Sequence, residues 1–328
     1  MGKLKSFLKK QCKKLTEKGY ACLKENDYDG ALKIAKELEE LHYTASFEIA
    51  ALTYAGMNNL EEAVKILEKG VDLAPDCWLN WQLLGNYRSN LGRYDEADTA
   101  YKNALECTNV RESSVHLNQA ILSIRLDRYE DALKKLECID ETELHLQVVS
   151  ARIDALMGIG RIDEASRLGL KTLEEQWDDE SEGELMGYIA ANICRMRLKQ
   201  RENKELIREF AIKSLAYHHN SPSLLAVIRY IDAKYSPKAM YYRMFLHAKI
   251  HVTSSLDEAV KGFYVNYDVV ADDSEEALEF IIEFENDEEI ENLSIEKIEA
   301  LEHRPDDPKG IYWRSFRFNY EEPLSEPE

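Results

Sequence analysis

The chain lacks several features that would assign it to a familiar class of protein. No apolar run reaches the roughly 18 residues of a transmembrane helix, and the N-terminus has no apolar centre of a signal peptide. The six cysteines are widely scattered and include no Cys-x-x-Cys pair, so they outline no disulfide framework. These absences favour a reducing compartment, and we expect a cytoplasmic protein.

Sequence signatures of catalysis are also missing. The chain contains no P-loop, no Gly-x-Gly-x-x-Gly, no Gly-x-Ser-x-Gly and no His-Glu-x-x-His. His247 and His251 would share a strand face, but about 13 Å of extended strand is too far for two ligands of one metal ion. We therefore expect a protein that is not an enzyme, with no catalytic residue, no cofactor and no metal site.

Acidic side chains outnumber basic ones outside the N-terminus. The chain has 62 acidic and 42 basic side chains, a net charge of −20, yet residues 1–18 hold seven lysines against one acidic residue, Glu17. An acidic body repels phosphate, so we do not expect nucleic acid as a partner. A protein or peptide partner, in particular a basic one, is easier to accommodate.

The basic N-terminal segment has an amphipathic pattern. Leu4, Phe7, Leu8, Cys12 and Leu15 fall on one face of a helix, with lysines around the rest. This suits either a helix over residues 1–18 that caps a repeat array or a helix on a membrane surface, and the first six residues also fit the N-myristoylation pattern. We favour the cap, because the ends of repeat arrays must be covered, and do not expect membrane binding.

Four alanines reveal an internal repeat. Ala31, Ala63, Ala97 and Ala132 stand in similar surroundings, 32, 34 and 35 residues apart, each after a turn and an aromatic residue or leucine. A period of this length is typical of stacked helix pairs, since one pair is too thin to bury its own apolar face. The pattern predicts a helical solenoid of five to six helix pairs over residues 12–235.

The repeat resembles the tetratricopeptide repeat, and the resemblance covers about residues 12–219. The best copy, residues 78–109, carries the signature residues Trp81, Leu84, Gly85, Tyr94, Ala97, Tyr101 and Ala104. The preceding copy has Phe47, Ala50, Ala51, Tyr54, Leu60, Ala63, Leu67, Gly70 and Pro75. The resemblance implies a right-handed α-α solenoid, and Gly85 is expected at its tightest helix crossing.

In this family the first helix of each repeat lines a concave groove that binds a peptide or helix. The positions that the resemblance assigns to the groove are Glu48, Leu52, Gln82, Asn86, Asn90, Leu117, Ile121, Arg125 and Asp154. Members that bind chaperones grip a C-terminal carboxylate with clustered lysines, arginines and asparagines. Only Asn86, Asn90 and Arg125 offer similar groups here, and we expect them to project into one surface.

Beyond His219 the periodicity changes from helical to alternating. Strands are expected over residues 242–250, 263–271, 293–302 and 311–320, with a short helix at 255–261 and a longer helix that starts at Asp273. This predicts a small α+β sandwich domain in residues 236–328, a four-stranded sheet with a helix on one face, from no family we recognise. The fold class predicted for the whole chain is therefore α+β.

The predicted C-terminal domain contains an acidic run. Between Asp272 and Glu291 eleven residues are acidic and none is basic. A solvated helix face followed by an acidic loop explains this composition, and a docking surface for a cationic partner is the alternative. In the alternative, the docking residues would be Glu285, Asp287, Glu288 and Glu289.

Two functional hypotheses follow. The first is a non-enzymatic scaffold or adaptor that binds a peptide or helix in the concave groove of the repeats. The second is an immunity or antitoxin-like inhibitor whose acidic C-terminal domain binds a basic toxin or nuclease. The two differ in which end of the chain holds the partner.

Overall fold

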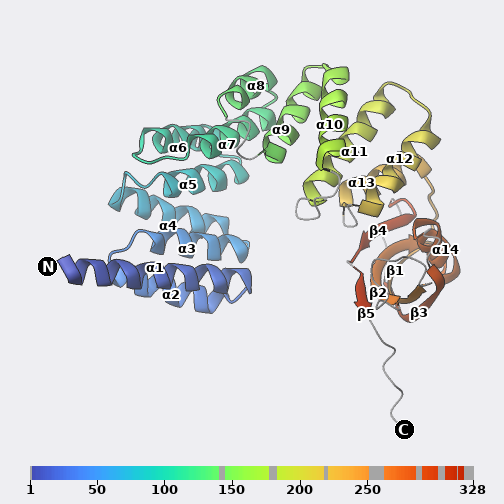
Figure 1. Ribbon diagram of the computed structural model, residues 1–328, viewed down its shortest axis with the longest axis horizontal. Coiled ribbons are helices and arrows are strands. Elements are labelled where there is room, and N and C mark those ends of the chain that lie inside the picture. Colours follow the sequence, from blue (N-terminus) through green and yellow to red (C-terminus); the bar gives the residue numbers. More distant parts are fainter. Residues whose placement is uncertain are drawn as a thin grey trace, which may run out of the picture. The chain divides into compact units, whose positions relative to one another are not determined.

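The computed structural model describes residues 2–139, 145–176, 183–217, 221–250, 262–285, 290–301, 307–315 and 317–320. The chain divides into two compact units, Met1–Ile159 (the N-terminal unit) and Gly160–Glu328 (the C-terminal unit). The described part of the N-terminal unit is helical, whereas the C-terminal unit combines helices with a sheet (Figure 1).

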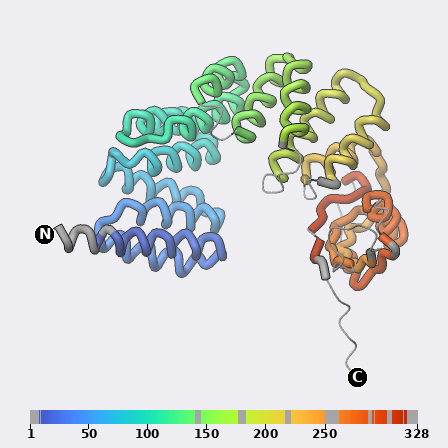
Figure 2. Tube along the Cα trace, viewed as in Figure 1, coloured from blue at the N-terminus to red at the C-terminus, as the bar shows by residue number. Residues whose placement is uncertain are grey.

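The N-terminal unit is a stack of antiparallel helices that follow one another along the chain (Figure 2). They are α1 (Gly2–Lys24), α2 (Tyr28–Glu40), α3 (Ala45–Gly56), α4 (Leu60–Leu73), α5 (Trp78–Asn90), α6 (Tyr94–Glu106), α7 (Glu112–Arg125), α8 (Tyr129–Glu137) and α9 (His145–Gly158). The basic segment is continuous with the first helix pair, because α1 extends unbroken to Lys24. Within α1, Cys12 is buried in the core and Leu8 is exposed.

The helices form pairs, and the pairs stack. Helices α1, α3, α5 and α7 each pack on the helix that follows them, and we call these four, with α9, the first helices. Each first helix also contacts the next one: α1 touches α3, α3 touches α5, α5 touches α7 and α7 touches α9. The first helices therefore form a continuous layer. We call α2, α4, α6 and α8 the second helices, and the surface of the layer that faces away from them the inner face.

The four repeat alanines explain the spacing of the layers. Ala31, Ala63, Ala97 and Ala132 lie in α2, α4, α6 and α8, and all four are fully buried. A small side chain at these points lets the second helix approach its neighbours closely, so leucine and aromatic side chains can fill the remaining space. The 32- to 35-residue period is thus a packing requirement repeated once per helix pair.

Gly85 of α5 has no room for a side chain. A Cβ atom there would lie 2.4 Å from the Tyr101 ring of α6, well inside van der Waals contact. The Tyr101 hydroxyl donates a hydrogen bond back to Asn86 Oδ1 (2.8 Å). Glycine in α5 and tyrosine in α6 are therefore complementary, as expected for a close crossing, and Gly158 makes an equally close approach to Tyr129.

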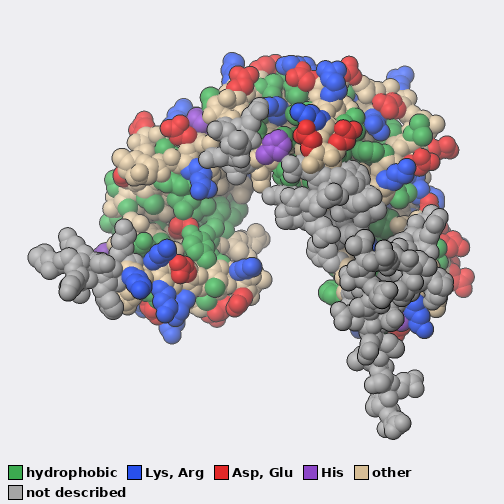
Figure 3. Space-filling model, in the orientation of Figure 1, with side chains coloured by type: hydrophobic (Ala, Val, Ile, Leu, Met, Phe, Trp, Pro, Cys, Tyr) green, Lys and Arg blue, Asp and Glu red, His purple; other side chains and the backbone are tan. Residues whose placement is uncertain are grey.

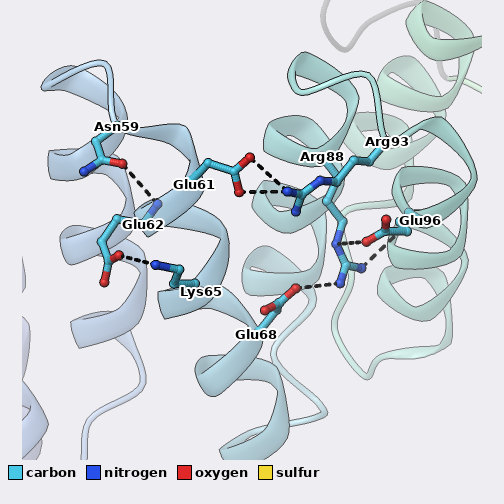
Figure 4. A network of polar contacts seen from close by, with 8 residues as sticks. All are labelled: Asn59, Glu61, Glu62, Lys65, Glu68, Arg88, Arg93 and Glu96. Atoms are coloured by element: carbon cyan, nitrogen blue, oxygen red, sulfur yellow. Dashed lines mark hydrogen bonds and ion pairs between the residues drawn. The ribbon is translucent and has the colours of Figure 1, made fainter.

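Charged side chains join α4 to the next pair at its turn (Figure 4). Arg93, at the start of α6, donates to both carboxylate oxygens of Glu61 (2.9 and 2.8 Å). Arg88 of α5, whose side chain is 16% exposed, donates to Glu68 (3.0 Å) and lies 3.4 Å from the Glu96 carboxylate. Exposed ion pairs contribute little singly, but a network held by a largely buried arginine fixes the register between pairs.

The C-terminal unit starts with α10 (Ile162–Gln176), α11 (Gly183–Lys199), α12 (Lys204–Tyr217) and α13 (Pro222–Asp232). A sheet and one further helix follow: β1 (Met240–Ile250), β2 (Gly262–Ala271), α14 (Ser274–Phe284), β3 (Ile290–Leu301), β4 (Gly310–Arg314) and β5 (Phe318–Tyr320). The described strands are antiparallel, in the order β3-β1-β2-β4, and β5 also pairs with β2. The short helix expected at 255–261 lies outside the described residues.

The sheet has five described strands instead of four, because the segment 311–320 is broken. Ser315 interrupts it: its backbone N–H donates to the Asn266 carbonyl, and its hydroxyl accepts from the Asn266 N–H (both 2.9 Å). A side-chain oxygen thus takes the place of a backbone acceptor, and the strand splits into β4 and β5. Aromatic residues occur on both sides of Ser315, at 312, 313, 316, 318 and 320, so the sequence does not reveal this break.

Helices cover one face of the sheet. On that face Met244, Leu246 and Ala248 of β1 are fully buried, and they alternate with the polar positions of the strand as expected. Helix α14 contacts β2 and β4, and α13 contacts β4. The sheet therefore packs on the last helices of the same unit, and that unit begins at Gly160, well before residue 236.

Candidate partner-binding surface

The sequence-predicted groove residues lie on the first helices α3, α5, α7 and α9, so the candidate surface is the inner face. Figure 3 shows hydrophobic side chains gathered over the region of α3 to α5. The side chains that matter for binding are those that this chain leaves without partners.

Glu48 is the most distinctive of them. It lies on α3, half-buried, and its carboxylate forms no hydrogen bond or ion pair with the described residues. Burial raises the pKa of this carboxyl to about 7. A desolvated carboxylate is normally paired with a cation, and none of the described side chains supplies one to Glu48.

Tyr87 of α5 adjoins Glu48, and sequence reasoning missed it. The ring is 8% exposed, and burial followed by the charge of Glu48 raises the pKa of its hydroxyl to about 12. The predicted row on α5 took every fourth residue (82, 86, 90) and passed over position 87. Tyr87 packs in the core with Ala63 and Leu67, so it adjoins Glu48 but offers little surface to a partner.

Two of the predicted polar residues are occupied within the chain. Gln82 is 8% exposed and donates through Nε2 to the Ser114 hydroxyl of α7 (3.0 Å), which ties two first helices together. Its buried Oε1 has no hydrogen-bond partner among the described residues. Asn86 accepts the hydrogen bond from Tyr101, so its oxygen stabilises the α5–α6 crossing. The side-chain oxygens of Asn86 and Asn90 are thus both engaged within the chain, and contact of Asn86 with a ligand stays a prediction.

Asn90 and Arg125 do come together at the ends of α5 and α7. Arg125 Nη1 donates to Asn90 Oδ1 (2.8 Å) and to Ser89 Oγ (2.9 Å), and both Asn90 and Arg125 are exposed. Arginine carries five donors, so a ligand carboxylate would still find donors on this guanidinium. The pair is a polar corner of the inner face, separate from Asn86.

The predicted apolar positions differ in exposure. Leu117 is 7% exposed and packs in the core with Ala120 and Leu136, so little of its side chain is accessible to a partner. Leu52 of α3 is half-buried, and Ile121 of α7 is 37% exposed. Asp154 of α9 is half-buried. Leu52 and Ile121 are therefore the more accessible of the three predicted apolar positions.

Glu285 does not belong to an exposed acidic surface. It is 7% exposed, and its carboxylate accepts from Arg314 (2.6 Å), from Arg317 (2.6 Å) and from the Tyr267 hydroxyl. Burial raises the pKa of Glu285, but the two guanidinium groups outweigh burial and hold it below its usual value. Asp287, Glu288 and Glu289 lie outside the described residues.

Within the part of the chain that the structure describes, no group of three or more histidine, cysteine or acidic side chains is placed to hold a metal ion. No described helix is both long and apolar enough to span a bilayer. The features that stand out on the inner face are therefore its apolar surface, the unpaired Glu48 and the Asn90–Arg125 corner.

A layer of paired helices with a period of 32 to 35 residues defines a helical repeat protein. A family model described as tetratricopeptide repeat matches residues 45–77 and 80–107, so these residues hold tetratricopeptide repeats and the resemblance is confirmed. A comparison with curated proteins found no match.

Comparison with solved structures gave matches at low identity. The structure of the APC/C hetero-tetramer Cut9-Hcn1 has 13% identity and a TM-score of 0.53, covering 66% of this chain and 41% of that one. TTC0263, a thermophilic TPR protein in Thermus thermophilus, has 20% identity and a TM-score of 0.47, covering 56% of this chain and 98% of that one. YrrB, a TPR protein with an unusual peptide-binding site, has 17% identity, a TM-score of 0.41, and coverages of 58% and 95%. The chain thus spans less than half of the Cut9-Hcn1 chain, and that likeness concerns the fold alone.

Proposed function

We propose that the protein is a non-enzymatic scaffold that binds a basic peptide or helix along the inner face of its first helices. The observation that carries this proposal is the unpaired carboxylate of Glu48. It lies half-buried beside an aromatic ring, among apolar side chains, with a pKa raised to about 7. A lysine or arginine of the partner would supply the missing cation, and Leu52 and Ile121 would contact its apolar side chains.

Overall charge supports the same partner class. The chain has a net charge of −20, so a basic ligand is attracted over distances of about a Debye length before it docks. The Asn90–Arg125 corner supplies donors for a backbone carbonyl or a carboxylate of the same ligand. The alternative is an inhibitor with an acidic docking surface in its C-terminal domain. Of the four carboxylates assigned to that surface, Glu285 is buried and therefore not accessible to a partner.

The test is selection of peptides from a random library on the immobilised full-length protein. We expect the selected peptides to be rich in lysine or arginine, and Glu48→Gln to weaken their binding roughly tenfold, as for loss of a charged hydrogen bond. Wild-type affinity should rise as pH increases from about 6 to about 8, because the cation requires ionised Glu48, and the variant should lose this dependence.

Glu37→Gln serves as the matched control, since Glu37 is an exposed acid on second helix α2. It changes the net charge by the same amount as Glu48→Gln. If both variants lost the same affinity for the selected peptides, long-range electrostatic attraction alone would explain the effect. That result would contradict a specific site at Glu48. Selection of peptides without basic residues would contradict the proposed partner class.

A further inference from the structure

A cleft lies between the second helices α2 and α4, on the side of α3 opposite to the inner face. It consists of two adjoining pockets, of about 350 and 430 Å³, that share Glu39, Ser46 and Phe47 as lining residues. Residues 46, 47, 50 and 54 of α3 face this cleft, whereas the groove positions of α3 are 48 and 52. The volumes match those of small-molecule sites, which span about 300–1,000 Å³.

The cleft exists because this repeat has smaller side chains than the next one. Ala63 and Ala97 occupy equivalent positions in two successive repeats, 34 residues apart. At the same spacing, Thr44 and Phe47 correspond to Trp78 and Trp81 of the following repeat. In the following repeat both tryptophans pack against the core around Ala97 and Tyr101. Here a threonine and a phenylalanine line the pockets instead, and the space that the indoles would occupy is open.

One buried polar group in the cleft has no partner. Ser46 is 3% exposed, and its hydroxyl forms no hydrogen bond with the described residues. It lines both pockets, so it is placed at their junction. An unsatisfied buried hydroxyl costs free energy unless a ligand atom reaches it, and this marks the junction as a point of recognition.

The walls and the rim indicate the ligand class. Leu32, Ala35, Ala50 and Ile66 give the first pocket an apolar wall, which suits an apolar body. At its rim, Lys69 is paired with Glu39, whereas the exposed Lys36 has no ion pair among the described residues. The unneutralised charge at the opening is therefore positive, in a protein that is strongly acidic overall.

We infer that this cleft binds a small molecule with an apolar chain and one carboxylate, such as a fatty acid. The carboxylate lies at the junction, where one oxygen accepts the hydrogen bond of Ser46 and Lys36 supplies the positive charge, and the chain extends along the apolar wall of the first pocket. The site shares none of the residues proposed for peptide binding, so each can be tested while the other is left intact.

The test uses decanoate, below its micelle concentration, as the probe of the full-length protein by calorimetry. We expect saturable binding, weaker binding of decanol, and no binding of decyltrimethylammonium. Lys36→Gln should weaken decanoate about two- to fivefold and leave decanol unchanged, as for an exposed ion pair. Lys33→Gln, an exposed lysine on α2 outside the cleft, should change neither.

Two further variants separate the cleft from general apolar binding. Ser46→Ala should weaken decanoate roughly two- to tenfold, as for one hydrogen bond. The double variant Thr44→Trp, Phe47→Trp copies the next repeat and should fill the pockets, abolishing binding without lowering the melting temperature. Absence of saturable binding, equal binding of the ammonium compound, or unchanged binding by a folded filled variant would overturn the inference.

Discussion

Protonation of a single residue, Glu48, sets part of the stability of the N-terminal unit. Its pKa is raised from 4.5 in the unfolded chain to about 7, so the folded state binds this proton more tightly. Stability must therefore fall as pH rises from about 4.5 to 7 and stay level above that. Glu48→Gln should be nearly neutral at about pH 5 and stabilising by on the order of 1–3 kcal/mol at about pH 8, allowing for partial exposure.

Urea denaturation of the two proteins at both pH values measures this difference. The control is Glu37→Gln, for which exposure predicts equal, small effects at both pH values. A Glu48→Gln variant whose stability relative to wild type is the same at both pH values would show that the carboxylate is better solvated than its position in α3 implies.

The close contact between Gly85 and Tyr101 gives a second prediction at the same scale. Gly85→Ala places a methyl group 2.4 Å from the ring and should destabilise the protein by about 1–3 kcal/mol through overpacking. Adding Tyr101→Leu should restore much of the loss, since Ala51 and Leu67 occupy the same two positions of the preceding repeat. Thermal melts of the single and double variants measure the loss and its recovery. A Gly85→Ala variant as stable as wild type would contradict the predicted overpacking.

Individual residues show how far sequence reasoning extends. Period and residue size identified the buried alanines and the tight glycine, because packing repeats with the helix pair. The hydrogen-bond partners of Asn86 and Gln82 were not predictable, since Tyr101 and Ser114 lie 15 and 32 residues away and reach them through the tertiary fold. For the same reason the acidic run concealed Glu285, whose arginine partners lie on and after β4.

At the scale of elements, the buried pair of Glu285 and Arg314 joins the end of α14 to β4. Glu285→Gln would leave the Arg314 guanidinium, 1% exposed, without its counter-charge, which costs about 3–5 kcal/mol. We expect the melting temperature to fall strongly, and Glu279→Gln, an exposed acid on the same helix, to leave it unchanged. Similar small effects in both variants would contradict the buried pair.

Element boundaries were predictable where local patterns determine them and uncertain where tertiary contacts do. The alternation in β1 and the Asp273 cap, which accepts from the N–H groups of Glu275 and Glu276 (3.0 and 2.9 Å), are local signals. The division between β4 and β5 depends instead on Ser315 pairing with Asn266, 49 residues away.

At the scale of the whole molecule, the sheet covers apolar surface of the last helices of the C-terminal unit. Arg229 of α13 lies over the Tyr312 ring (3.8 Å) and donates to the Ile311 carbonyl, while Leu225 and Ile228 line a pocket with Phe280 and Ile311. A fragment ending at residue 235 would expose this apolar surface, whereas residues 160–328 retain it.

We therefore expect the fragment 160–328 to be monomeric and folded, and the fragment 1–235 to aggregate or bind a hydrophobic dye. Size-exclusion chromatography and dye fluorescence of the two fragments measure this difference. A stable, soluble fragment 236–328 alongside a well-behaved 1–235 would instead support the independent C-terminal domain that the sequence predicted.

The pairing of Gly85 with Tyr101 has a consequence for how such an array can evolve. Equal periods suggest that units could be deleted or exchanged by recombination, as α4 and α6 begin at equivalent points. A chain in which α6 followed α3 would press the methyl group of Ala51 into the ring of Tyr101, because α3 has alanine where α5 has glycine. The packing of each core thus fixes the order of these repeats. Recombination that separated α5 from α6 would be selected against, because Gly85 and Tyr101 must stay together.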